Sequence, residues 1–142
     1  MVADPYRIIA LQNTPADCQL IEQIFNRDEF EIRTFADARS FIQYMRIQPP
    51  PHCFLCDLEM GKENGLDIID KVRKNQRWTK VAIVVLAEAV NKKTLVSLSQ
   101  FQIKGYIVKP YQPPRLFNEV LKAMGLEVVT QKVPVKRLKS KG

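Results

Sequence analysis

Short apolar runs alternate five times with stretches in which apolar residues recur at helical spacing, and this alternation limits the fold more than any other feature. The apolar runs, which predict strands, are Arg7–Leu11, Glu31–Phe35, Cys53–Asp57, Val81–Leu86 and Gly105–Val108. The stretches with helical spacing lie near 15–26, over Asp37–Ile47, around Leu66–Val72, near 91–102 and over Pro113–Met124. Strands that alternate with helices predict a parallel sheet with helices on both faces. The expected fold class is therefore α/β, a doubly wound five-stranded parallel sheet with five helices.

The length of 142 residues is typical of one domain, and a hydrophobic fraction of 46% is enough for a core of that size. The chain has no run of about 18 apolar residues. Its N-terminus also lacks the basic and apolar regions of a secretory signal. We therefore expect a cytoplasmic protein without a membrane span. Cys53 and Cys56 would point to opposite faces of one strand, so we expect buried thiols rather than a redox or metal pair.

Three loop residues carry local predictions. Thr14, directly before Pro15, is a candidate cap for the first helix, and Asn64 is a candidate cap for the third. Trp78 lies in the polar connection between the third helix and the fourth strand. We expect the indole of Trp78 to pack at the edge of the domain.

The net charge of +7 is unevenly distributed along the chain. Residues 1–125 hold 17 Lys and Arg against 14 Asp and Glu, a balance of +3, whereas residues 126–142 hold 5 against 1, a balance of +4. The tail lysines and arginine that could contact phosphates are Lys132, Lys136, Arg137, Lys139 and Lys141. No aromatic residues alternate with them, so a solvated basic extension is favoured over nucleic-acid binding.

Four sets of polar or small residues follow the first, third, fourth and fifth predicted strands. They are Gln12 and Asn13, then Asp57, then Ala87 and Glu88, and finally Lys109. In an open α/β sheet the carboxyl ends of the strands form the edge where ligands bind. A carboxylate beside an ammonium there would suit an anion or a phosphoryl group. The alternative is that Asp57 merely starts a turn or caps the next helix.

Two short motifs at this edge resemble a known family. Asp57-Leu58-x-Met60 with Gly65-Leu66 matches one motif of the receiver domain of two-component response regulators, the CheY-like fold, and Tyr106-x-x-Lys109-Pro110-Tyr111 matches another. The resemblance covers about residues 6–124, and we expect a receiver domain over 1–125 with a basic C-terminal extension over 126–142. It implies the strand order 2-1-3-4-5. It also implies that Asp57 is the phosphoacceptor, that Lys109 contacts the phosphoryl group and that Tyr106 is the switch aromatic.

The chain departs from the family pattern at five positions, one of which is Gly61 in place of the usual Pro. Gln12 and Asn13 stand where the family has an acidic pair that holds Mg²⁺. Ala87 stands where a Ser or Thr is expected, and Glu88 follows at the access position, which is usually small. Only Asp57, the amide oxygen of Asn13 and the backbone carbonyl of Glu59 would remain as metal ligands.

These losses weaken the expected metal site and raise a further hypothesis. Mg²⁺ is usually held through one or two carboxylates, so we expect no tightly bound cofactor. Glu88 would add a negative charge near an incoming phosphoryl group. One hypothesis is that Glu88 instead pairs with Lys109 and holds it without phosphate.

Two main functional interpretations remain, and neither is an enzyme of another class. In the first, the chain is a degenerate, metal-poor receiver that acts by protein–protein interaction. Its surface would be formed by the helix near 91–102, Gly105–Val108 and Pro113–Met124, a face that could also form a homodimer. That face carries Lys92, Lys93, Lys104, Tyr106, Arg115 and Lys122. In the second, it is a working phosphoacceptor in a phosphorelay, phosphorylated on Asp57 by a sensor histidine kinase.

Overall fold

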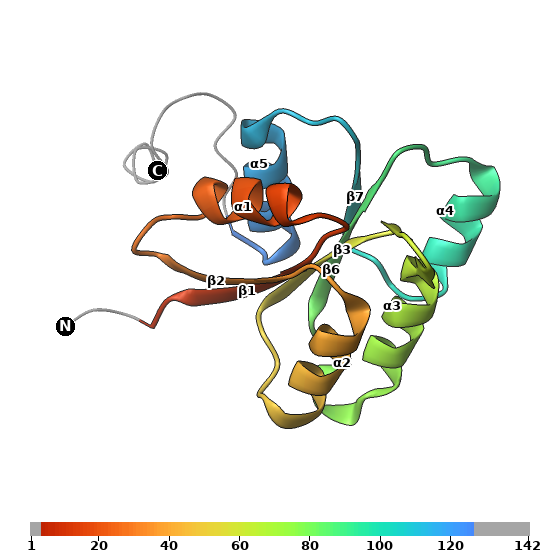
Figure 1. Ribbon diagram of the computed structural model, residues 1–142, viewed down its shortest axis with the longest axis horizontal. Coiled ribbons are helices and arrows are strands. Elements are labelled where there is room, and N and C mark those ends of the chain that lie inside the picture. The colour runs from red at the N-terminus through yellow and green to blue at the C-terminus, as the bar shows by residue number, and fades with distance from the viewer. Residues whose placement is uncertain (1–3, 127–142) are drawn as a thin grey trace.

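A computed structural model describes residues 4–126 of the chain and shows a central sheet flanked by helices (Figure 1). The strands of this sheet are β1 (Tyr6–Leu11), β2 (Phe30–Phe35), β3 (Cys53–Asp57), β6 (Ala82–Ala87) and β7 (Gly105–Val108). The α-helices are α1 (Pro15–Ile24), α2 (Ala38–Ile47), α3 (Gly65–Lys74), α4 (Lys92–Ser99) and α5 (Pro113–Ala123). Between β3 and α3 lies a small hairpin of β4 (Glu59–Met60) and β5 (Glu63–Asn64), and after α3 comes a 3-10 helix, η1 (Gln76–Trp78).

The strands of the sheet are all parallel and lie in the order β2-β1-β3-β6-β7. This confirms the predicted order 2-1-3-4-5, because β6 and β7 are the fourth and fifth strands once the hairpin is set aside. The hairpin is a separate antiparallel pair and was not expected from the sequence. Its strands have two residues each, which is too short to show an alternating pattern.

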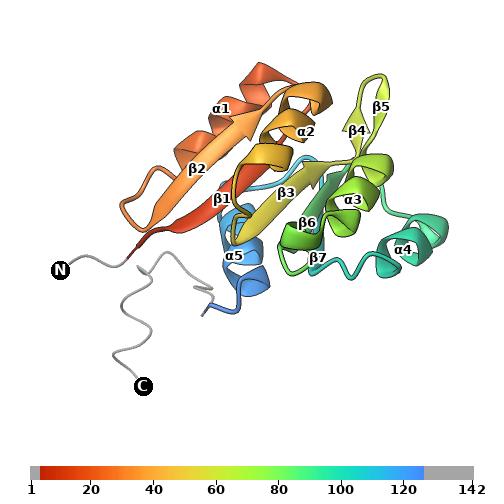
Figure 2. The same cartoon turned by 90° about the horizontal axis from the view of Figure 1, so that it is seen from below.

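Two apolar layers hold the helices on opposite faces of the sheet (Figures 1 and 2). One layer joins the sheet to α1 and α5, and the other joins it to α2, α3 and Leu98 of α4. Cys53 belongs to the first layer and Cys56 to the second, and both are buried free thiols. Burial raises the pKa of Cys53 to about 12. The expectation of buried thiols on opposite faces of one strand is therefore confirmed.

Two predicted helix caps are present. Thr14 Oγ1 accepts a hydrogen bond from the backbone N–H of Asp17 at 3.1 Å, at the start of α1. Asn64 Oδ1 accepts one from the N–H of Leu66 at 2.8 Å, at the start of α3. Each side-chain oxygen satisfies a donor that the first turn of a helix leaves without a partner.

Two helices are shorter than predicted by two residues or more. The first ends at Ile24 instead of 26, and the fourth covers Lys92–Ser99 instead of 91–102. Gln102, at the end of the turn after α4, has φ 58°. This left-handed conformation is incompatible with a continuing right-handed helix, so the apolar spacing extends past the true end of α4.

The expectation that Trp78 packs at the domain edge is wrong. Trp78 is 0% exposed and belongs to the core layer beneath α2 and α3. Its ring meets Phe41 edge-on, with ring centroids 5.8 Å apart, and Phe41 in turn stacks on Phe54 at 4.6 Å. The polar residues around Trp78 conceal this, because η1 turns one side chain inward from an otherwise exposed connection.

Arg73 of α3 anchors the connection that precedes β7. Its guanidinium donates hydrogen bonds to the carbonyl oxygens of Phe101 at 2.7 Å, Val81 at 2.8 Å, Thr79 at 3.1 Å and Gln102 at 3.2 Å. Those carbonyls belong to the segments before β6 and after α4. The planar group therefore ties two irregular segments to one helix.

Two further sequence expectations concern the membrane and the tail. Within residues 4–126, none of the helices combines the length and the hydropathy needed to cross a bilayer. The tail with Lys132, Lys136, Arg137, Lys139 and Lys141 lies outside the described residues.

The burial of Trp78 predicts a large effect of truncating it. Trp78→Ala should lower the free energy of unfolding by about 3–5 kcal/mol, because the substitution leaves a cavity between α2 and α3. Ile47→Ala is the control, because Ile47 is 76% exposed and should change stability by no more than about 0.5 kcal/mol. Urea denaturation of both variants gives the comparison, and equal small effects would contradict the placement of Trp78 in the core.

Candidate functional site

Backbone hydrogen bonds bring the carboxyl ends of β3, β6 and β7 together at one edge of the sheet. Asp57 is in register with Leu86, and Ala87 is in register with Val108. Beyond the strands, the N–H of Leu58 donates to Leu86 at 2.8 Å and the N–H of Lys109 donates to Ala87 at 2.8 Å. These bonds place the side chains of Asp57 and Lys109 at the same edge.

Asp57 is a buried carboxylate with two donors. Its side chain is 0% exposed, and its two oxygens accept hydrogen bonds from Lys109 Nζ at 2.9 and 3.0 Å. Oδ1 also accepts the backbone N–H of Glu59 at 2.9 Å. Burial raises the pKa of Asp57 above the usual aspartate value, and this effect outweighs the opposing influence of Lys109 and the Glu59 N–H.

Lys109 is shared between two carboxylates. Besides Asp57, its Nζ lies 3.1 Å from Glu59 Oε1. Burial lowers the pKa of Lys109, but hydrogen bonds to Asp57 and Glu59 outweigh it, so the net shift is upward and the ammonium stays charged. The hypothesis that Glu88 pairs with Lys109 is wrong in the described structure, where the ion pairs of Lys109 are with Asp57 and Glu59.

Glu88 takes part in the site through its backbone N–H and not through its side chain. The Glu88 N–H lies 3.2 Å from Glu59 Oε1 and 3.1 Å from Glu59 Oε2. The Glu88 side chain is exposed. The residue that completes the pair is therefore Glu59, two positions after Asp57. For Glu59 we expected only a role of the backbone carbonyl, although an acidic residue two positions after Asp57 was a visible signal.

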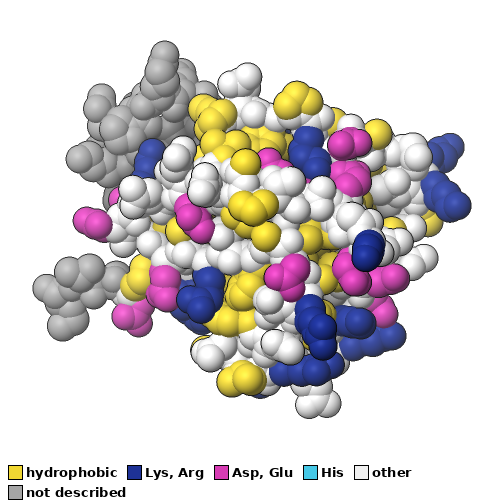
Figure 3. Space-filling view, viewed as in Figure 1, with side chains coloured by type: hydrophobic (Ala, Val, Ile, Leu, Met, Phe, Trp, Pro, Cys, Tyr) yellow, Lys and Arg dark blue, Asp and Glu magenta, His cyan; other side chains and the backbone are white. Residues whose placement is uncertain are grey.

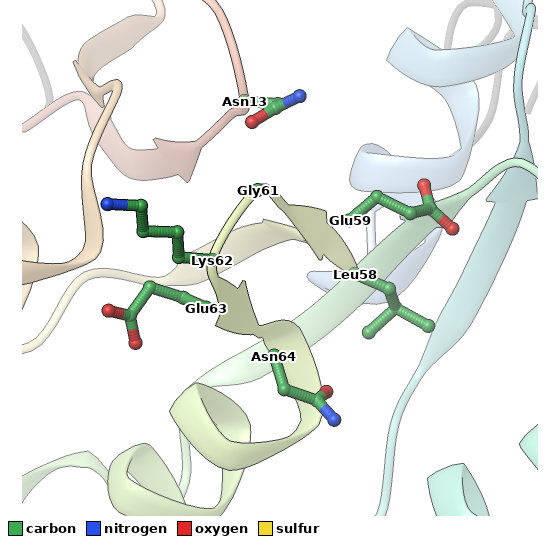
Figure 4. Close-up of a pocket in the computed structure, with 7 residues that line it drawn as sticks. All are labelled: Asn13, Leu58, Glu59, Gly61, Lys62, Glu63 and Asn64. Atoms are coloured by element: carbon green, nitrogen blue, oxygen red, sulfur yellow. The ribbon is translucent and has the colours of Figure 1, made fainter.

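Gln12 and Asn13 lie after β1, beside the end of β3. Gln12 is buried, and its Nε2 donates to the carbonyl oxygen of Leu11 at 2.9 Å. Asn13 is exposed and lines a pocket with the β4–β5 hairpin (Figure 4). Figure 4 shows Asn13 above the hairpin tip at Gly61.

The donor set does not fit a tightly held Mg²⁺ ion. This ion prefers near-octahedral oxygen coordination and is usually held by one or two carboxylates. Both oxygens of Asp57 already accept from Lys109, and the Glu59 carboxylate is bound by Lys109 and the Glu88 N–H. Among residues 4–126, no group of three or more His, Cys, Asp or Glu side chains is arranged to hold a metal. Asn13 would offer only a neutral oxygen.

Ala87 and Tyr106 occupy the other two predicted positions at this end of the sheet. Ala87 is the last residue of β6 and is fully buried, and its methyl group has no hydrogen-bonding capacity. Tyr106 of β7 is 40% exposed. Asp57, Ala87 and Lys109 are thus gathered at the edge, whereas the Tyr106 ring lies partly in solvent.

Two glycines shape the loop that carries Glu59. A Cβ on Gly65 would lie 2.5 Å from Leu58 Cα and 2.7 Å from the Asp57 carbonyl oxygen, so the start of α3 can approach the end of β3 only without a side chain. Gly61, at the hairpin turn, has φ 65°, a conformation that glycine adopts at low cost. The tight hairpin between them directs Glu59 toward Lys109.

The comparisons with known proteins agree with this geometry. The sequence model described as the response regulator receiver domain matches residues 8–121. Response regulator Rcp1 of Synechocystis is 21% identical over 136 residues, which cover 89% of this chain and 92% of Rcp1. The alginate biosynthesis regulator AlgB of Pseudomonas aeruginosa is 27% identical over 127 residues, which cover 89% of this chain but 28% of AlgB. The chain thus spans little more than a quarter of that relative.

Solved structures show the same fold. The chemotaxis response regulator CheY4 of Vibrio cholerae superposes with a TM-score of 0.77 at 17% identity, over 84% of this chain and 99% of CheY4. The Mn²⁺-bound form of Rcp1 superposes with a TM-score of 0.71 at 20% identity, over 92% of this chain and 99% of that one. Receiver domains are signalling modules that interact with histidine kinases and other proteins. With its CheY-like sheet and a family match over most of its length, this chain belongs to the receiver-domain family of two-component response regulators.

Proposed function

We propose that this chain is an atypical receiver that acts by binding a protein partner and does not depend on Mg²⁺-assisted phosphorylation. The observation that carries the proposal is the ion pair between Asp57 and Lys109, which is complete without any phosphate. Gln12 and Asn13, at the positions of the acidic pair, support it. Asp57 keeps the phosphoacceptor position, and Lys109 keeps the position that would contact a phosphoryl group.

The electrostatic argument favours a weak metal site. Each unit charge about 4 Å away contributes about 4 kcal/mol at an effective dielectric constant of about 20, and a divalent cation doubles that value. Replacing two carboxylates by the amides of Gln12 and Asn13 therefore removes more than about 10 kcal/mol of attraction, before the desolvation of the ions is counted. Transfer of a phosphoryl group to Asp57 would also require the Lys109 ammonium to turn from the aspartate toward the phosphoryl oxygens.

Ala87 removes a second contribution to a phosphorylated state. A hydroxyl at the end of β6 could donate a hydrogen bond to a phosphoryl oxygen, and each hydrogen bond to a charged group contributes about 1.5–3 kcal/mol. The methyl group of Ala87 cannot donate one. A phosphoryl group on Asp57 would therefore have Lys109 as its main charged contact.

The alternative is a working phosphoacceptor that a histidine kinase phosphorylates on Asp57. The retention of both Asp57 and Lys109 supports this alternative, because the ammonium could balance the charge of a modified aspartate. The two proposals differ in one measurable property, which is the transfer of a phosphoryl group to Asp57 in the presence of Mg²⁺.

The surface formed by α4, β7 and α5 is the proposed partner site. Four of its large apolar side chains are exposed: Leu95, Val96, Tyr106 and Val108. Leu95 and Tyr106 line one shallow pocket between α4 and β7. Lys and Arg side chains also lie over α4, at the right of Figure 3. Exposed apolar residues among positive charges suit a partner with an apolar, acidic surface, and a second copy of the chain is the simplest alternative.

The first test is incubation with Mg²⁺ and a small phosphodonor such as phosphoramidate. We expect the intact mass of the wild-type chain to stay unchanged, because the donor set around Asp57 holds Mg²⁺ poorly. A receiver domain with the full acidic pair serves as the positive control. A mass gain of one phosphate that Asp57→Asn abolishes would favour the working phosphoacceptor.

The second test concerns the stability of the Asp57–Lys109 pair. Lys109→Met should lower the free energy of unfolding by about 3 kcal/mol, because it leaves the buried Asp57 carboxylate without its cation. Lys104→Met is the control, because Lys104 is exposed and should change stability by no more than about 0.5 kcal/mol. Adding Asp57→Asn to Lys109→Met should recover part of the loss in urea denaturation, and full additivity of the two substitutions would contradict the pair.

The third test concerns the partner surface. The measured quantity is the phenotype that deletion of the gene produces in the native host. Val96→Glu should reproduce this phenotype, that is, abolish the output of the protein, because it places a charge in the apolar face of α4. Ile47→Glu is the matched control, since it makes the same change at an exposed apolar residue on α2. Asp57→Asn should retain the output. Loss of output in Asp57→Asn together with normal output in Val96→Glu would overturn the proposal.

A further inference from the structure

Glu59 makes a set of contacts that a surface glutamate does not usually make. Its carboxylate lies 3.1 Å from Lys109 Nζ, and 3.2 and 3.1 Å from the backbone N–H of Glu88. The two donors come from the ends of β7 and β6. Glu59 therefore connects three parts of the sheet edge through one anionic group.

The donors that hold Glu59 are those that an oxyanion beside Asp57 would use. An ammonium and a free backbone N–H at the end of a strand are typical partners of phosphate oxygens. Lys109 already binds Asp57, so its remaining capacity faces Glu59. The Glu88 N–H donates to Glu59 as well. An oxyanion that arrived at Asp57 would find both donors occupied.

The exposure of the side chains gives the order in which they lie from the core outward. Asp57 is 0% exposed, Lys109 is 21% exposed and Glu59 is 41% exposed. Glu59 is therefore the outermost of the three and lies on the solvent side of the pair. The negative charge of Glu59 would therefore repel an anion that approached Lys109 from solvent.

The hairpin holds Glu59 in this orientation. The backbone N–H of Glu59 is bound to Asp57 Oδ1 at 2.9 Å, and β4 pairs with β5 across the Gly61 turn. Figure 4 shows the Glu59 side chain on the opposite side of the hairpin from Lys62 and Glu63. The backbone of the hairpin thus sets the direction in which the Glu59 side chain leaves the main chain.

A simple surface ion pair is the competing explanation. Exposed pairs contribute little to stability, because solvent screens them and ordering the side chains costs entropy. The Glu88 N–H is the observation that argues against it. This donor lies directly after β6, 29 residues away in sequence, and it contacts both carboxylate oxygens.

We propose that Glu59 is a resident anion of the receiver site, which occupies Lys109 and the Glu88 N–H and excludes phosphate-like oxyanions from Asp57. This inference rests on the proposed function, because it concerns the same site. Two carboxylates, Asp57 and Glu59, surround one ammonium, so the three groups together carry a net charge of −1. The contacts that a phosphoryl group would make are thereby made by the chain itself.

The test measures equilibrium binding of inorganic phosphate at constant ionic strength, with the Glu88 amide resonance as the reporter in ¹H–¹⁵N spectra. The variants are Glu59→Gln, which keeps the shape of the side chain, and Glu59→Ala, which removes it. We expect both to bind phosphate at least about fivefold more tightly than the wild type, because even in bulk water the repulsion from a unit charge about 4 Å away has an effect of this order.

Glu63→Gln is the matched control, because it removes the same charge from the same hairpin, on the opposite side from the Glu59 side chain. It should bind phosphate as weakly as the wild type. Adding Lys109→Met to Glu59→Gln should abolish the gain, which would locate the phosphate at this site. Equal phosphate affinities in the wild type, Glu59→Gln and Glu59→Ala would overturn the role of Glu59.

This result is independent of the phosphodonor experiment. If the wild type accepted a phosphate from phosphoramidate on Asp57, the proposed function would fail, but the comparison of Glu59 and Glu63 variants would still measure occupancy of the donors. If the phosphate affinities were equal while the wild type stayed unphosphorylated, the role of Glu59 would fail and the proposed function would stand.

Discussion

The contact between the Asp57 carboxylate and the Lys109 ammonium is the interaction on which the arrangement of the site depends. The two residues are 52 positions apart in sequence, and the register of β3, β6 and β7 brings them to one edge. The carboxylate is fully buried, so its charge requires a partner. In return, Lys109 fixes the end of β7 against the end of β3.

Burial disfavours the charged form of Asp57, and for the same reason the buried carboxylate needs a cation beside it. Removal from water raises the pKa of Asp57 even though the ammonium and the Glu59 N–H stabilise its charge. A pair of this kind adds little net stability compared with apolar residues of similar volume, yet breaking one half is costly. Its retention is therefore better explained by the function of the edge than by the stability of the fold.

The β4–β5 hairpin turns a two-residue pair into a three-residue cluster. Gly65 allows the start of α3 to approach the end of β3, and Gly61 closes the turn between the two short strands. This geometry brings the Glu59 carboxylate to Lys109 and to the Glu88 N–H. The fold is thus the same as that of other receiver domains. What the hairpin adds at the edge of the sheet is the contact of the Glu59 carboxylate with Lys109 and the Glu88 N–H.

The sequence by itself determined the α/β class, the five strands of the sheet and the family. The spacing of apolar residues reflects which face of each strand or helix is buried, so it can be read directly from the sequence. The motifs around Asp57 and Lys109 similarly located the edge where the site lies. The helix caps at Thr14 and Asn64 were predictable because capping is a local interaction.

Only the tertiary structure decided which side chains meet. The burial of Trp78 depends on how η1 turns toward Phe41, and no local pattern records that direction. The partner of Lys109 proved to be Glu59 rather than Glu88 because the hairpin, whose strands are too short to leave a periodic signal, sets the direction of Glu59. Local sequence thus specified the elements, whereas long-range register and one tight turn specified the contacts.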